Sequence, residues 1–72
     1  MKYQISTIRR RSRNNGTNFC QYYVICDAET GEIIYDNDSK VGTKSNFREK
    51  SLRITLDKLN NGEIKKETLW KQ

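Results

Sequence analysis

The residues in this chain most able to do chemistry form a block of four arginines within five positions, Arg9, Arg10, Arg11 and Arg13, and no acidic residue precedes Asp27. Arginine always keeps its charge, and its planar guanidinium presents a fork of donors that matches the oxygens of a phosphate. The block therefore predicts an edge that faces phosphate. Contact with a protein partner and simple solvation of a strand end are the two alternatives.

The segment that follows the block offers further donors. Residues 14–18 read N-N-G-T-N, a composition typical of a hairpin turn. The side-chain amides of Asn14 and Asn15, together with backbone N–H groups, could reach phosphate or base edges. We therefore place a nucleic-acid site on the four arginines and these two asparagines.

Charge is unevenly distributed along the chain. Residues 1–13 carry +5, residues 27–38 carry five acids and no base, and residues 40–72 carry +5 again, for a net charge of +5. A polyanion would be steered away from the acidic segment. We expect it to approach the end of the molecule that holds the turn at residues 14–18.

Most catalytic constellations are missing from the sequence. Without histidine, no Ser-His or Cys-His dyad can form. The four glycines are isolated, so there is no phosphate-binding loop, and the pairs Asp36/Asp38 and Glu29/Glu32 are interpreted as solvated turn residues rather than as catalytic or Mg²⁺ ligands. We expect a non-enzyme with no cofactor or metal.

Length and composition indicate one small domain spanning residues 1–72 with a thin core. A chain of this size buries only about 60% of its unfolded surface, which makes a homodimer an open alternative. It has neither an apolar run near the roughly 20 residues of a membrane span nor a signal peptide, so a cytoplasmic location is expected, in the host cell if the protein is viral. Plentiful Asn and Lys suggest an AT-rich genome, such as that of a phage or mobile element.

Two strands are predicted in the first half of the chain. Lys2–Arg11 is one, although its alternation slips between Ile5 and Ile8, which predicts a bulge or an early end. Phe19–Cys26 is apolar at seven of eight positions and is expected to be central. Its two cysteines, Cys20 and Cys26, would lie roughly 20 Å apart on one strand, too far for a disulfide. With no histidine they form no zinc site either.

A tight hairpin is predicted at Asp27–Glu32, as a type I turn with Gly31 in the left-handed region. It would join the central strand to a third strand, Glu32–Asp36, with Cys26 opposite Ile33 and Val24 opposite Tyr35. One face would then hold Cys20, Tyr22, Val24, Cys26, Ile33 and Tyr35, and the other Phe19, Gln21, Tyr23, Ile25 and Ile34. Residues 37–45 are expected to form a loop.

A helix is predicted from residue 46 or 47 to Asn60. Asn46 with Glu49 has the spacing of a capping box, Asn61-Gly62 is a stop signal, and the leucines at 52, 56 and 59 form one stripe. The alternative is a strand, because L-R-I-T-L alternates. Residues 63–71 would be a short strand or an ordered tail, with Trp70 docked on the core or on a partner.

These elements predict an α+β fold, a small antiparallel sheet of three strands, or four in the alternative, packed against one helix, in the order β-β-β-α(-β). The element order over residues 2–60 resembles that of the arm-site domains of transposon integrases and the plant ethylene-response-type DNA-binding domain. The resemblance implies a sheet face in the major groove of DNA, so DNA is expected ahead of RNA. The nucleic-acid contacts would then include Arg9, Arg11, Arg13, Gln21 and Tyr23 on the strands, with backbone contacts from Lys44, Arg48 and Arg53.

The alternative function is that of a small phage or viral inhibitor of a host defence protein. A single helix leaves one face of a three-stranded sheet uncovered, and an exposed apolar patch normally has a partner. We expect the open face to be the one that holds Phe19, Tyr23, Ile25 and Ile34. The partner-binding candidates are Phe19, Tyr23, Ile25 and Trp70, and a homo-oligomer could cover the same face.

Overall fold

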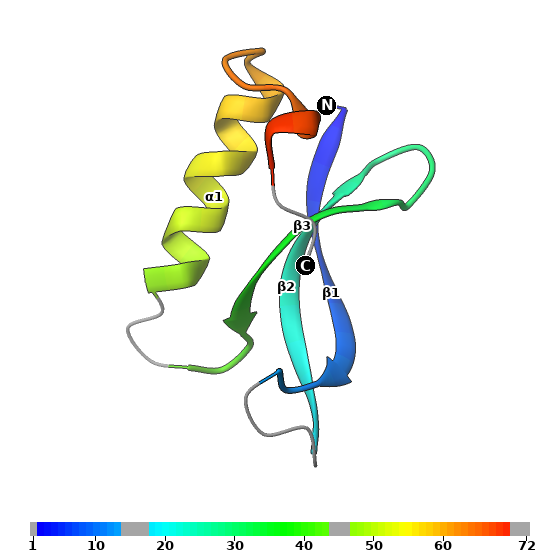
Figure 1. Ribbon diagram of the computed structural model, residues 1–72, viewed down its shortest axis with the longest axis vertical. Coiled ribbons are helices and arrows are strands. Elements are labelled where there is room, and N and C mark those ends of the chain that lie inside the picture. Colours follow the sequence, from blue (N-terminus) through cyan, green and yellow to red (C-terminus); the bar gives the residue numbers. More distant parts are fainter. Residues whose placement is uncertain (1, 14–17, 44–46, 70–72) are drawn as a thin grey trace.

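A computed structural model describes residues 2–13, 18–43 and 47–69 of the chain. Three antiparallel strands in the order β1-β2-β3 form one sheet, and a helix follows them (Figure 1). The elements are β1 (Tyr3–Arg11), β2 (Phe19–Asp27), β3 (Ile33–Lys40), α1 (Phe47–Asn60) and a 3₁₀ turn, η1 (Lys66–Thr68). The predicted α+β class and element order are confirmed.

Strand β1 pairs with β2 without interruption. The register runs from Tyr3 opposite Asp27 to Arg11 opposite Phe19. The predicted bulge between Ile5 and Ile8 is wrong, because the two isoleucines lie on opposite faces of a regular strand and each is half-buried.

The turn between β2 and β3 forms as predicted. The Gly31 N–H donates to the Asp27 carbonyl at 2.9 Å, and Gly31 has a φ of 77°. The Asp27 carboxylate accepts the N–H groups of Glu29 and Thr30 at 2.8 and 3.1 Å. These two hydrogen bonds lower the pKa of Asp27, because they favour its ionised form.

Strand β3 is longer and more irregular than predicted. Cys26 does lie opposite Ile33, but Tyr35 lies opposite Ile25 rather than Val24, and the strand continues to Lys40 where a loop was expected. Two register shifts produce the difference. In the larger one Asp38 adopts a φ of 63°, which Asp tolerates better than most residues, and its N–H donates to Asp36 Oδ1 at 2.9 Å.

Helix α1 confirms the predicted helix and excludes the strand alternative. Its first predicted cap, Asn46, lies outside the described residues. At the other end, Gly62 has a φ of 77° and the Glu63 N–H donates to the Lys58 carbonyl at 2.9 Å. The Asn60 amide accepts the Tyr3 N–H at 3.0 Å and donates to the Tyr3 carbonyl at 3.2 Å, so the helix end is fastened to β1.

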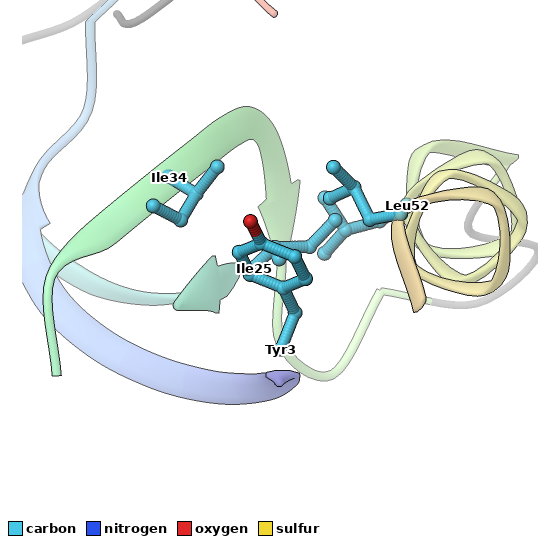
Figure 2. Packing of buried hydrophobic residues seen from close by; sticks show 5 residues of the cluster. Tyr3, Ile25, Ile34 and Leu52 are labelled. Carbon is cyan, nitrogen blue, oxygen red and sulfur yellow. The ribbon is translucent and has the colours of Figure 1, made fainter. Parts of the chain in front are cut away.

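The core lies between α1 and the sheet. Leu52 reaches from the helix toward Tyr3 and Ile25 (Figure 2), and Ile34 and Leu59 complete the buried cluster. The helix therefore covers the face that we expected to be open, the one that holds Ile25 and Ile34. That expectation is wrong because both faces of β2 are apolar, and the pattern of β2 alone does not say which face the leucines meet.

The chain after α1 packs back against this core. Ile64 and Leu69 contact the cluster on either side of η1, and residues 63–69 contain no strand. Trp70 lies outside the described residues. None of the helices in the described part of the chain combines the length and the apolar character needed to cross a membrane.

Candidate nucleic-acid interface

The strand geometry divides the arginine block between the two faces of the sheet. Successive side chains of β1 point in opposite directions, so Arg9 and Arg11 share one face and Arg10 lies on the other. This division determines which charges are available to a ligand.

The Arg10 side chain extends across the sheet, on the face opposite to that of Arg9 and Arg11. Its guanidinium lies 3.8 Å from the centroid of the Tyr22 ring on β2. Beyond the ring it donates to Asp36 on β3, from Nε to Oδ2 at 2.8 Å and from Nη2 to Oδ1 at 3.1 Å, and Nη2 also donates to Asp38. One side chain thus connects all three strands.

Arg13 binds the same two carboxylates. Its Nη2 lies 3.3 Å from Asp36 Oδ2, and its Nη1 lies 3.1 Å from Asp38 Oδ1. Asp36 is only 3% exposed, so the interpretation of this pair as solvated turn residues is wrong for Asp36. Two arginines and two aspartates form a cluster whose charges balance.

The electrostatics of the cluster favour the ionised state of both partners. Burial opposes the charge on Asp36, but hydrogen bonds from Arg10 and from the Asp38 N–H outweigh it and lower the pKa of Asp36. The hydrogen bond to Asp36 likewise raises the pKa of Arg10 above its ordinary value, against the opposing effect of burial. Arg10 is thus held in the fold by charge-assisted bonds rather than presented to solvent.

Arg9 and Arg11 have a different environment. Both are exposed, and neither makes an ion pair with any residue in the ranges 2–13, 18–43 and 47–69. Their guanidinium carbons lie 5.7 and 5.3 Å from the centroid of the Phe19 ring. Phe19 is the cross-strand partner of Arg11, and the exposed Gln21 is the partner of Arg9. These four residues form what we call the Arg–Phe face.

The Arg–Phe face lies beyond the reach of the helix. Tyr3 and Ile25 lie further along the same side of the sheet and are covered by α1, whereas the end of the β1–β2 hairpin extends past the start of α1 (Figure 1). Tyr23 lies between these two regions and packs partly against the core. Of the predicted strand contacts, the structure therefore brings together Arg9, Arg11 and Gln21, and separates Arg13 from them.

The acidic turn lies at the opposite end of the sheet. Eight strand steps separate the Tyr3–Asp27 pair from the Arg11–Phe19 pair, which corresponds to about 27 Å. Glu29 and Glu32 lie in that turn, where Lys66 comes within 3.7 Å of Glu32. Asp36 and Asp38 belong to the arginine cluster instead of this acidic end.

A shallow hollow of about 260 Å³ opens on the Tyr22 side of the sheet. Arg13 contacts the carboxylate of Asp38 there, and the backbone carbonyl of Asp38 accepts a hydrogen bond from Arg48 Nη1 at 3.4 Å. The lining combines both signs of charge with small polar groups: Ser12, Arg13, Asn18, Cys20, Tyr22, Asp38, Lys40 and Arg48. Arg13 pairs with the Asp38 carboxylate, so the hollow offers an anion less than the Arg–Phe face does.

The remaining predicted residues are dispersed. Arg53 pairs with Glu49 on the helix surface at 3.0 Å, and Arg48 lies at the hollow. Ile25, a predicted partner contact, has no exposed surface and belongs to the core. The predicted sites at Asn14, Asn15, Lys44 and Trp70 lie outside the described residues.

Sequence reasoning missed the roles of Asp36 and Asp38. A signal did exist, since two acids two positions apart on a strand lie on the same face as each other. It could not be used without the register of β3, which the bulge changes.

Comparisons with known proteins leave the assignment to the geometry. No family model matches the chain, and no curated protein or solved structure is significantly similar to it. No solved structure therefore supports the resemblance in element order to the two DNA-binding families. Within the described ranges, no group of three or more His, Cys, Asp or Glu residues could hold a metal ion.

Proposed function

We propose that this protein binds nucleic acid, with Arg9 and Arg11 of the Arg–Phe face as its principal phosphate contacts. The observation that carries the proposal is the division of the arginine block. Two arginines are exposed without an acidic partner among the described residues, at the end of the sheet face that α1 does not reach. Guanidinium groups in such a setting suit phosphate oxygens.

Arg10 and Arg13, the other two arginines of the block, are not proposed as phosphate contacts. Asp36 and Asp38 balance the charges of Arg10 and Arg13, so these two arginines attract a polyanion less strongly than Arg9 and Arg11 do. Their proposed role is to tie β1 to β3 across β2.

We further propose that the protein acts by binding alone and that it is encoded by a phage or mobile element, with DNA as its first target. The sequence offers no histidine and no phosphate-binding loop for catalysis, and the acidic turn lies about 27 Å from the proposed contact. A duplex or strand at the Arg–Phe end would therefore avoid most repulsion at moderate salt, where the screening length is about 10 Å.

The test is fluorescence anisotropy of labelled oligonucleotides at about 50 mM salt, where each lost phosphate contact costs most. The double variant R9A/R11A is compared with K50A/K58A, which removes the same charge from exposed positions on α1. We expect R9A/R11A to weaken binding at least about tenfold and K50A/K58A to change it much less. Equal losses of affinity in both variants would mean that binding depends only on net charge, which would contradict the proposal.

A second candidate, inhibition of a host protein, rests on a different surface from the one predicted. Phe47 is 78% exposed, and Ile54 lies two turns along the same side of α1. If the wild type bound no nucleic acid, this stripe would become the proposed contact. Capture of one host protein by the wild type and not by F47A/I54A would then support it.

A further inference from the structure

Phe19 is an unusual neighbour for two phosphate-binding arginines. Its ring is 54% exposed at the uncovered end of the sheet, although strand residues of this kind are normally placed where they can be buried. It lies directly opposite Arg11, and both guanidinium carbons of the Arg–Phe face are within 6 Å of its centroid. An exposed ring with two cations close beside it has the composition of a surface for base stacking.

The geometry points to single-stranded nucleic acid as the ligand of this face, with one base stacked on the Phe19 ring. This inference rests on the function proposed above and specifies its substrate class. In a duplex both faces of each internal base are already stacked, so Phe19 would have only base edges and backbone to touch. In a single strand the base faces are free, and every base has a π-face that a phenylalanine can meet.

The arginines fit the same ligand. Arg9 and Arg11 lie on one side of β1, and their backbone positions, two residues apart, are separated by about 6.8 Å. That separation is comparable to the distance between successive phosphates of an extended strand. Each guanidinium can therefore take one phosphate while the neighbouring Phe19 ring takes a base, and the planar group can also stack on a neighbouring base.

Gln21 adds a polar group to the same face. It is exposed, pairs with Arg9 across the strands, and lies two residues from Phe19 on β2. Its amide both donates and accepts, so it can bond to the edge of whichever base lies beside the stacked one. This contact would be tolerant of sequence, as expected for stacking-based recognition.

The test compares three labelled ligands of about 12 units, within the site sizes of known single-strand binders. They are an oligothymidine, the same backbone without bases, and a duplex. We expect wild type to prefer oligothymidine over both others. F19A and F19L should each weaken oligothymidine binding by about 5- to 100-fold, and F19W should retain it, because only an aromatic ring stacks. Binding of the abasic strand should be unchanged in all three variants.

Two controls separate the possible failures. F47A removes the other strongly exposed phenylalanine, which lies 6.0 Å from Lys50 on the helix, and should leave every affinity unchanged. If all three ligands bind equally, or if F19L binds oligothymidine like wild type while R9A/R11A does not, the stacking inference is overturned and the proposed function stands. If wild type binds no ligand at about 50 mM salt, both are overturned. Tighter binding of the duplex would assign the face to double-stranded DNA instead.

Discussion

Arg10 on the first strand and Asp36 on the third are joined by two hydrogen bonds, at 2.8 and 3.1 Å, and the Arg10 guanidinium lies over the ring of Tyr22 on the strand between them. This contact connects the outer strands of the sheet on the side that has no helix. It also removes Arg10 from the charges that a ligand would meet. The same pair thus bears on the stability of the fold and on the location of the binding surface.

Replacing Asp36 with Asn should be strongly destabilising. Asp36 is 3% exposed, and its loss leaves Arg10 partly buried without its principal counter-charge. Breaking a buried ion pair from one side costs about 3–5 kcal/mol, so we expect D36N to lower the free energy of unfolding by about 3 kcal/mol. Urea unfolding followed by circular dichroism measures this.

The control is D38N. Asp38 is more exposed, and Asn tolerates its φ of 63°, so a loss of no more than about 1 kcal/mol is expected. Equal losses in the two variants would mean that the buried Asp36 contributes no more to the free energy of unfolding than the more exposed Asp38.

Acid should weaken the fold through Asp36. Its pKa is lower in the folded chain than the ordinary value of 3.8, so the folded state binds fewer protons than the unfolded state in this range. The stabilisation is complete above about pH 5 and is lost as the pH falls through 3.8 and then through the folded pKa. Wild type and D36N should therefore differ most at neutral pH and converge in acid.

Urea titrations of both proteins at several pH values test this convergence. Asp27 also has a lowered pKa but is present in both chains, so its effect cancels in the difference. A constant difference between the two proteins down to pH 2.5 would rule out an ionised Asp36 as the source of the stability.

Leu52 should be the most sensitive helix position. It has no exposed surface and contacts the cluster formed by Tyr3, Ile25 and Ile34. L52A should lower stability by about 2–5 kcal/mol, which is most of what a core this small supplies. I54A on the exposed side should change it by no more than about 0.5 kcal/mol. Thermal unfolding of both variants distinguishes the two faces, and similar losses would contradict the described orientation of α1.

The acidic turn should be irrelevant to binding. Asp27 accepts two backbone hydrogen bonds that shape the turn, so Glu29 is the better position for charge reversal. E29K should leave oligonucleotide affinity unchanged or slightly raised, since the turn lies more than one screening length of about 10 Å from Arg11. Anisotropy titrations measure this, and a marked weakening would place the acidic end inside the interface.

Local patterns predicted the parts of the fold that depend on local chemistry. The Gly31 turn, the apolar β2 strand and the helix with its Asn61-Gly62 stop all follow from residues close together in the chain. β3 did not follow, because its bulge places Asp38 in the left-handed region and the local residue pattern does not mark that position. The covered face was mispredicted for a related reason, since both sides of β2 are apolar.

The candidate site was predictable only in part. Strand alternation places Arg9 and Arg11 together and Arg10 apart from the sequence alone. Which of them a carboxylate neutralises depends on where Asp36 falls across the sheet, and that depends on the register of β3. Phe19 was expected to contact a protein, and its closeness to two guanidinium groups could be known only from the pairing of β1 with β2.

The most direct test of the account is the salt dependence of oligonucleotide binding in wild type, R9A/R11A and K50A/K58A. If Arg9 and Arg11 each contact a phosphate, the slope of log K against log salt should fall by about 1.4–1.8 in R9A/R11A, since each contact contributes about 0.7 on single strands and 0.9 on duplex. The slope of K50A/K58A should match that of wild type. An unchanged slope in R9A/R11A would contradict the assignment of phosphate contact to these two arginines.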